Sequence, residues 1–386
     1  MYQNSHTPLN ALPFETLKAK RSTKWRDYPA DVTPLHVAEM DFEIAKPIRD
    51  RLIQMIADSD TGYLGAIPEL GESIEWFANK RWGWQVDKEE IFTATDVGVG
   101  MVEMARQFVK PGDRILLNTP VYHNFANWIA ELGCIKVEAP LKQTGMHFTL
   151  DLERVEAEYK TGVKVHFLCN PHNPVGTVFS KEELIKLADL AEKYGVVVFS
   201  DEIHAPLTFD ESSFHPFLSV SETARKVGII VTSASKSWNL AGLKCAYIIT
   251  ADENMKHKAT TMPMAVHYRA SLLGAVAAAE ALRCVEWLDS ALTRIDMNRQ
   301  LISELVQKNL PQAKYRIPDF GYLAWVDLAE YNLGDNPSQY FIDKAKISTN
   351  PGHAFGQQCS SFVRINFGTS PEILTSAIEA MGAAVK

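Results

Sequence analysis

Residues 233–244 read SASKSWNLAGLK, and they place one lysine, Lys236, among small hydroxyl residues. The segment lies between two apolar runs, residues 227–232 and 245–249, so we expect it to form a loop between two buried strands. A lysine that forms an imine must lose its proton, and both burial and neighbouring cations lower the pKa of a lysine. Hydroxyl groups beside it can donate hydrogen bonds to an anion such as a phosphate. A solvated loop lysine is the alternative that this segment alone leaves open.

Two further segments place polar residues at the ends of predicted strands. NPHNPVG (residues 170–176) follows an apolar run and is typical of a rigid turn. GVVVFSDEIH (residues 195–204) is a buried-strand pattern that ends in Asp201, a carboxylate that can cap a loop or pair with a ring cation. Ligands of α/β sheets bind at the carboxyl ends of the strands. The two segments therefore indicate a binding site at this edge of a sheet.

In this order, NPHNPVG, SDEIH and SASKSWNLAGLK resemble the motifs of fold-type I pyridoxal-phosphate (PLP) enzymes of the class I/II aminotransferase superfamily. The early segments KWRDY (residues 24–28) and VAEMDF (residues 37–42) resemble its cystathionine β-lyase (C–S lyase) branch, which includes MalY- and PatB-type proteins. The similarity runs from about residue 20 to the C-terminus. It implies the α/β fold of the aspartate aminotransferase-like PLP-dependent transferases, with a large PLP-binding domain and a smaller α+β domain. We expect the large domain at residues 48–285 and a discontinuous small domain at residues 1–47 and 286–386.

The pattern of the chain also indicates an α/β protein. Between about residues 90 and 250, apolar runs alternate with helical patterns such as Lys181–Tyr194, which is typical of a mainly parallel sheet covered on both faces. The expected strands are Ile91–Thr95, Arg114–Leu117, Ile135–Glu138, Val163–Cys169, Val196–Ser200, Gly228–Thr232 and Cys245–Thr250. Further on we expect a long helix through residues 287–310 and strands at residues 322–327 and 361–367. The resemblance implies that the N-terminal segment packs on this last unit.

The composition restricts the partners and the compartment. The 386 residues are 46% hydrophobic and carry a formal net charge of −8, which gives no basic surface for nucleic acid or an anionic membrane. The first 20 residues lack a secretory signal pattern, and no run approaches the ~20 apolar residues of a membrane span. Five scattered cysteines indicate reduced thiols, so we expect a cytoplasmic protein. His166, Cys169 and His172 are poorly spaced for zinc, and no metal is expected.

A phosphate site is predicted where DVGVG (residues 96–100) opens a helix, which we expect to extend over Met101–Val109. The N–H groups at a helix N-terminus bind phosphate readily. Glu103 occupies the third glycine position of a dinucleotide fingerprint, which argues against a nicotinamide cofactor. Lys244 stands where many relatives carry arginine, so it keeps the charge but loses the bidentate fork. By the resemblance, the phosphate-binding residues are Val97, Gly98, Val99, Ser233, Ser235 and Lys244.

The resemblance also implies residues for the cofactor ring. Asp201 pairs with the pyridinium nitrogen, and a carboxylate beside a cation has a lowered pKa, so we expect it to stay ionised. Asn173 binds the phenolic oxygen and contributes to substrate binding, and Tyr122 stacks on the ring and takes part in catalysis. His204 stands where many aminotransferases carry tyrosine, and the lyase branch shares Asp-Glu-Ile-His, so this position favours a lyase. The role of His204 is left open.

Two more residues complete the predicted site. Arg364 can present two parallel donors to the α-carboxylate of an amino-acid substrate. Tyr63 matches a tyrosine that in relatives reaches the phosphate of the neighbouring subunit. The resemblance therefore implies a homodimer with shared active sites.

The sequence as a whole predicts a PLP-dependent enzyme for α,β-elimination of L-cystathionine or cysteine S-conjugates to pyruvate, ammonia and a thiol. Lys236 carries the cofactor imine and acts as general base at the substrate Cα. An aminotransferase shares the same lysine and arginine and is the first alternative. A regulatory protein that retains the lyase fold and binds a transcription factor is the second.

Overall fold

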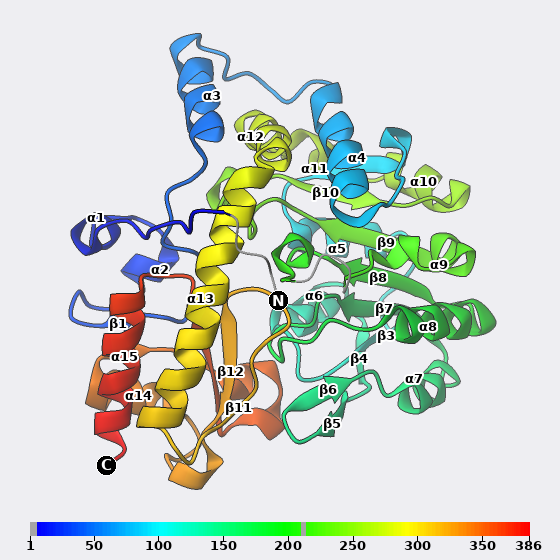
Figure 1. The fold of residues 1–386 in the computed structure, drawn as a ribbon. Coiled ribbons are helices and arrows are strands. Elements are labelled where there is room, and N and C mark those ends of the chain that lie inside the picture. Colours follow the sequence, from blue (N-terminus) through cyan, green and yellow to red (C-terminus); the bar gives the residue numbers. More distant parts are fainter. Residues whose placement is uncertain (1–5, 210–213) are drawn as a thin grey trace.

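The computed structural model describes residues 6–209 and 214–386 (Figure 1). A seven-stranded sheet occupies the right half of the view in Figure 1, with strand order β2-β10-β9-β8-β7-β3-β4. The strands are β2 (Ile91–Ala94), β3 (Arg114–Leu117), β4 (Ile135–Glu138), β7 (Val163–Cys169), β8 (Val197–Asp201), β9 (Gly228–Thr232) and β10 (Ala246–Ile249). Each predicted strand is confirmed to within one residue at either end. Strand β10 runs antiparallel to both of its neighbours, β2 and β9, and the other pairs are parallel, so the sheet is mainly parallel, as predicted.

Both faces of this sheet are buried, which explains why its strands read as apolar runs. Side chains alternate along a strand, so Ile229 and Val231 of β9 pack on one face and Ile230 packs on the other. The first face is covered by α5 (Val97–Ala105), α6 (Asn124–Glu131) and α10 (Glu253–Thr260). The second is covered by α7 (Leu152–Tyr159), α8 (Lys181–Tyr194), α9 (Glu222–Val227) and α12 (Leu272–Arg283).

Local capping sets the ends of the helices beside the site. In α8, Ser180 and Glu183 form the predicted capping box, and Gly195 ends the helix with a left-handed φ of 65°. The predicted bounds of α5, Met101 and Val109, are wrong, because the helix begins at Val97 and ends at Ala105. The physical reason is an N-cap: Asp96 Oδ1 accepts a hydrogen bond of 2.9 Å from the Val99 amide. The two glycines that follow therefore belong to the first turn of α5 and not to a loop before it.

A second unit lies on the left of Figure 1, where the N-terminal and C-terminal segments meet. Its four-stranded sheet has the order β11 (Lys314–Tyr315), β12 (Leu323–Asp327), β15 (Phe362–Asn366) and β14 (Asn350–Pro351). The helices of this part are α13 (Val285–Asn309), α14 (Pro337–Ala345) and α15 (Pro371–Ala384). The predicted long helix and both predicted strands are confirmed. The division into two domains at residues 48 and 285 stays a prediction.

The N-terminal segment packs on this second unit. Strand β1 (Thr33–Pro34) pairs in parallel with β13 (Ile347–Ser348). Asn366 Nδ2 donates hydrogen bonds to the backbone oxygens of Val37 and Glu39, at 2.6 and 2.7 Å. These contacts hold residues 36–40 against β15, next to the ends of the central strands.

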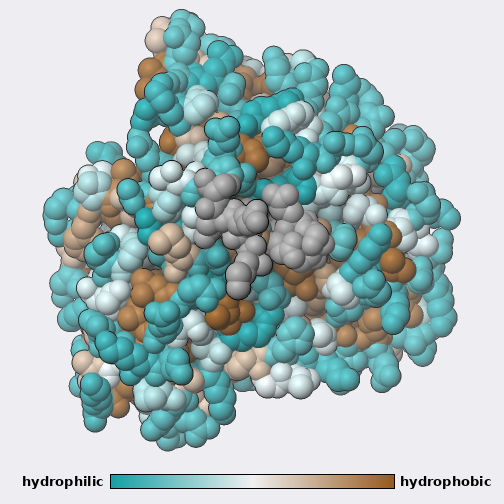
Figure 2. Space-filling view, in the orientation of Figure 1, coloured by the Kyte–Doolittle hydropathy of each residue, from teal (hydrophilic) through white to brown (hydrophobic). Residues whose placement is uncertain are grey.

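Further elements that the sequence did not predict are the hairpin β5 (Lys142–Thr144) and β6 (His147–Thr149), and the helices α1 (Phe14–Lys18), α2 (Thr23–Arg26), α3 (Lys46–Ala57), α4 (Pro68–Trp82) and α11 (Met264–Tyr268). Figure 2 shows a face covered mainly by hydrophilic side chains, with apolar side chains in small groups. Within residues 6–209 and 214–386, no helix combines the length and the apolar character needed to cross a membrane.

Candidate active site

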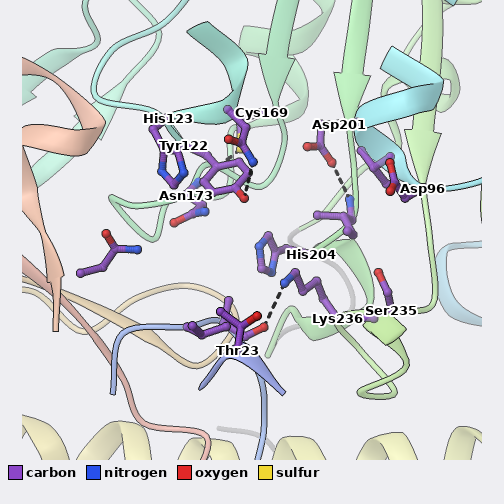
Figure 3. A pocket seen from close by; sticks show the side chains of 18 of the residues that line it. Thr23, Asp96, Tyr122, His123, Cys169, Asn173, Asp201, His204, Ser235 and Lys236 are labelled. Atoms are coloured by element: carbon purple, nitrogen blue, oxygen red, sulfur yellow. Dashed lines mark hydrogen bonds between the residues drawn. The ribbon is translucent and has the colours of Figure 1, made fainter. Parts of the chain in front are cut away.

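A cavity of about 550 Å³ lies where the central strands β7, β8 and β9 end and the second unit begins (Figure 3). It brings together most of the predicted site residues. Those that line it are Val97, Gly98, Tyr122, Asn173, Asp201, His204, Ser235, Lys236, Lys244 and Arg364. Residues far apart in the chain thus converge on one cavity at the carboxyl edge of the sheet, which is where α/β proteins bind ligands.

Lys236 lies in the loop after β9 and is half-buried. Its Nζ donates a hydrogen bond of 2.9 Å to the backbone oxygen of Ala38, drawn as a dashed line in Figure 3. Burial lowers the pKa of Lys236 to about 8, and the Arg364 cation acts in the same direction. A lysine with this pKa is partly deprotonated near neutral pH, as a nucleophilic or basic lysine must be.

Asp201 is the last residue of β8 and is only 5% exposed. Its Oδ1 accepts a hydrogen bond of 3.1 Å from the Ile203 amide, and burial raises the pKa of its carboxyl to about 7. The expected lowering of this pKa is therefore not found in the protein itself. Among the described residues no cationic side chain forms an ion pair with Asp201, so burial dominates. The Ile203 amide and the nearby Lys236 charge oppose this effect only in part, and a cation bound directly to the carboxylate would stabilise it further.

Arg364 and Asn173 form the opposite wall. Arg364 lies on β15 and is 3% exposed, and its Nη2 donates to the backbone oxygen of His36 at 3.1 Å. Its Nη1 donates to Asn173 Oδ1 at 3.2 Å, while its Nε is buried without a partner. Burial lowers the pKa of Arg364 to about 10. A buried guanidinium with an unsatisfied N–H group beside a cavity fits an anionic ligand.

Tyr122 and His204 also line the cavity. The hydroxyl of Tyr122 accepts a hydrogen bond of 2.7 Å from Asn124 Nδ2, and burial raises the pKa of Tyr122. His204 is 5% exposed, packs against the Phe320 ring with a centroid distance of 5.6 Å, and has a buried Nδ1 without a partner. Burial lowers the pKa of His204 to about 3, so the imidazole is neutral at physiological pH. A neutral imidazole here can donate one hydrogen bond and accept another but cannot supply charge.

The predicted phosphate end of the cavity is formed by the N-terminus of α5. Gly98 lies against Trp128, and a Cβ atom at this position would be 3.0 Å from the indole Nε1. Lys244 Nζ forms an ion pair of 3.0 Å with Asp96 Oδ2 across the cavity rim. Glycine at position 98 therefore lets Trp128 pack against the first turn of α5, where backbone N–H groups and the Lys244 cation are available to a phosphate.

Three predicted site residues do not line this cavity. The amide of Val99 already donates to Asp96, and the hydroxyl of the buried Ser233 donates to the Cys245 oxygen at 2.6 Å. Ser233 Oγ also accepts from the Ser235 amide at 3.1 Å, so it shapes the loop that carries Lys236. Tyr63 is 90% exposed and lies away from the cavity of its own chain. The phosphate roles predicted for these residues stay predictions.

Sequence reasoning missed several residues that line the cavity, namely Thr23, His36, Ala38, His123, Trp128 and Asn350. Ala38 contributes its backbone oxygen and lies within the VAEMDF segment. Its place in that motif could therefore have identified it as a site residue. The others reach the cavity through tertiary packing, which no local pattern encodes.

The side chains present fit PLP. Asp201 offers a buried carboxylate to a ring nitrogen, and the start of α5 with Gly98 and Lys244 offers donors and a cation to a phosphate. Lys236 offers an amine with a lowered pKa to an aldehyde. These groups border one cavity, as a single cofactor requires.

The architecture is that of the fold-type I PLP-dependent transferases. Residues 30–381 match the family described as aminotransferase class I and II, and the chain belongs to this family.

Individual relatives show which members of this family the chain is similar to. A Mycobacterium tuberculosis protein that carries the provisional name cystathionine beta-lyase is 38% identical over 97% of each chain. The cystathionine beta-lyase of Corynebacterium glutamicum is 32% identical, covering 94% of this chain and 96% of the relative. A crystal structure from Corynebacterium diphtheriae, provisionally titled a PLP-dependent beta-cystathionase, has a TM-score of 0.93 and 32% identity, covering 98% of this chain and 99% of the other.

Proposed function

We propose that this chain is a PLP-dependent C–S β-lyase that converts L-cystathionine or cysteine S-conjugates to pyruvate, ammonia and a thiol. The single observation that carries the proposal is the cavity that joins Lys236, Asp201 and Arg364. The relatives named cystathionine beta-lyase, at 32–38% identity over nearly the whole chain, support the lyase class.

Different residues bind the ring and the phosphate of the cofactor. Asp201 holds the ring nitrogen, Asn173 the phenolic oxygen, and Tyr122 lies against the ring. The phosphate is held at the start of α5 by Val97, Gly98, Ser235 and Lys244, with Val99 and Ser233 behind them. When bound, PLP supplies an electron sink for the negative charge that develops at the substrate Cα.

Arg364 and Lys236 act on the substrate. Arg364 binds the α-carboxylate, since its guanidinium is buried and has an unsatisfied Nε–H. Lys236, with a pKa near 8, removes the Cα proton and can return a proton to the departing sulfur. His204 remains neutral beside Lys236 and carries no charge of its own into the cavity.

The proposed enzyme is a homodimer in the cytoplasm, with Tyr63 of the partner subunit completing the phosphate site. Tyr63 is 90% exposed, and on the preceding helix α3 the side chains of Ile53 and Ile56 are 61% and 58% exposed. Large apolar and aromatic side chains so close together and so exposed are typical of a surface that a second copy covers.

Transamination is the second candidate, because the family itself is described as aminotransferase class I and II. The two reactions share Lys236, Asp201 and Arg364 and diverge only after the Cα proton has left. Loss of a good leaving group from Cβ gives elimination, and transfer of the amino group to a keto acid gives transamination.

The test is pyruvate release from L-cystathionine by PLP-loaded protein without added keto acid. Equal amounts of pyruvate, ammonia and homocysteine are expected from the wild type, and none from the Lys236→Ala variant. No pyruvate from any cysteine S-conjugate, together with keto-acid-dependent turnover, would replace the lyase by an aminotransferase.

A further inference from the structure

A second cavity, of about 340 Å³, adjoins the active-site cavity. Tyr122 and His123 line both of them. The rest of its wall comes from the segments at the carboxyl ends of β3 and β4 and from the loop of residues 353–358. The two cavities therefore adjoin at Tyr122 and His123, just before α6, and the second lies at the same carboxyl edge of the sheet as the first.

The second cavity contains one side chain of each charge. Lys136 and Glu138 both lie on the edge strand β4, two positions apart, so their side chains are on the same face of the strand. Their charged groups are 2.5 Å apart, with 46% and 38% of the side chains exposed. Both line the cavity and neither is enclosed by the fold. The pair is available to a ligand that carries a positive and a negative group close together.

Tyr122 and His123 form the partition between the two cavities, and this partition contains polar groups. His123 has a buried Nδ1 without a hydrogen-bond partner, and its ring packs against Tyr122 and Phe355 with centroid distances of 4.6 and 6.2 Å. Phe355 also lies under the Arg364 guanidinium, at 5.0 Å from the ring centroid. One aromatic side chain thus contacts both the residue proposed to bind the substrate carboxylate and the partition.

We propose that the second cavity is the subsite for the leaving thiol and that Lys136 and Glu138 bind its distal amino-acid group, which makes L-cystathionine the preferred substrate class. This inference rests on the proposed lyase function. Beyond its sulfur, cystathionine carries an ammonium and a carboxylate on one carbon, and Glu138 and Lys136 are complementary to these two groups. A substrate fixed at Arg364 and Lys236 extends its Cβ substituent past Tyr122 and His123 into this cavity.

The fold does not need this ion pair. Exposed pairs contribute about 0–1 kcal/mol to stability, so replacing either residue leaves the folded protein intact. A hydrogen bond between charged groups in a ligand complex has a larger effect, and its loss corresponds to roughly a 10-fold or greater drop in kcat/KM. Binding of the distal group and stability of the chain can therefore be separated by mutation.

The experiment measures pyruvate release from L-cystathionine and from S-methyl-L-cysteine by PLP-loaded wild type, Lys136→Met and Glu138→Gln. For each variant we expect kcat/KM for L-cystathionine to fall about 10-fold or more, while S-methyl-L-cysteine, which lacks a distal charge, is turned over as by the wild type. Lys193→Met is the matched control, because it removes an exposed ion pair between Lys193 and Glu156 that lies outside both cavities. This control should leave kcat/KM for both substrates unchanged.

Two results would overturn the subsite. One is unchanged turnover of L-cystathionine in both cavity variants, and the other is an equal loss for both substrates. If the wild type releases pyruvate from neither substrate, the proposed lyase function itself fails, and the inference fails with it. The wild-type measurement therefore distinguishes the two failures.

Discussion

Arg364 Nη1 donates a hydrogen bond of 3.2 Å to Asn173 Oδ1 and so joins the second unit to the turn that follows β7. The two residues are proposed to bind different parts of one complex, the substrate carboxylate and the phenolic oxygen of the cofactor. Because the bond is buried in the wall that the two residues form, a substrate that engages Arg364 also sets the position of Asn173. Recognition of the carboxylate is thereby coupled to the geometry of the cofactor ring.

Arg364→Lys should weaken substrate binding more than it weakens cofactor binding. A single ammonium cannot donate to Asn173, to the His36 oxygen and in parallel to a carboxylate, as the guanidinium can. We expect kcat/KM for the sulfur amino acid to fall roughly 10- to 100-fold, mainly through KM. Steady-state kinetics with Arg225→Lys, whose arginine pairs with Glu90 away from the cavity, as the matched control would test this. An unchanged KM would contradict the assignment of Arg364.

Asp201→Asn should stabilise the cofactor-free protein in a pH-dependent way. Burial raises the pKa of Asp201 to about 7, above the unfolded value of about 3.9, so the folded state binds more protons between these pH values. Stability is therefore lost as pH rises from about 4 through 7, and asparagine avoids this loss. The gain should reach at most about 4 kcal/mol above pH 7 and be smaller near pH 5.

Urea unfolding of the cofactor-free wild type and of Asp201→Asn at about pH 5 and about pH 8 measures this difference. The same variant should lose nearly all lyase activity when PLP is present, because no carboxylate then holds the ring nitrogen. A gain that is equal at both pH values would show that the charge of Asp201 is not its cause.

Tyr63→Phe should lower the affinity for PLP without changing the stability of the cofactor-free chain. The side chain is 90% exposed, and the rest of its own chain makes no use of its hydroxyl within the described residues. If the partner subunit's Tyr63 reaches the phosphate, losing one hydrogen bond to a charged group should raise the Kd for PLP roughly 10-fold. Tyr268→Phe, another exposed tyrosine, is the control. Titration of both variants with PLP measures this Kd. An unchanged Kd in Tyr63→Phe would show that Tyr63 does not bind the phosphate.

The sequence predicted the central sheet well because each of its strands is buried on both faces. A run such as Val163–Cys169 is continuous and bounded by turn residues, so its limits can be read directly. Lys236 and Asp201 could be found for the same reason, since each lies at or just beyond the end of such a run.

Residues placed by tertiary packing could not be found in this way. His36 reaches the cavity because β1 pairs with β13, more than three hundred positions away in the chain. His123 and Trp128 reach it because α6 packs against α5. The lowered pKa of Asp201 was predicted for a carboxylate beside a cation, and it stays a prediction. In the protein alone burial raises this pKa, because a sequence motif shows the partner a carboxylate can have but not how deeply the fold buries it.

Lys24→Met should destabilise the protein and also impair substrate binding. Lys24 and Asp41 form an ion pair of 2.8 Å with side chains 0% and 2% exposed, and Lys24 Nζ also donates to the Glu39 oxygen at 3.0 Å. Removing the lysine leaves a buried carboxylate without its cation, which costs about 3–5 kcal/mol. The double variant Lys24→Met, Asp41→Leu should recover most of that loss, because neither charge remains buried.

The pair fixes the segment whose backbone oxygens, at His36 and Ala38, accept hydrogen bonds from Arg364 and Lys236. KM for the amino-acid substrate should therefore rise in the single variant and return toward the wild-type value in the double variant. Thermal unfolding and steady-state kinetics on the three proteins measure both effects. If stability recovers in the double variant but KM does not, the charges themselves, and not the position of residues 36–40, control substrate binding.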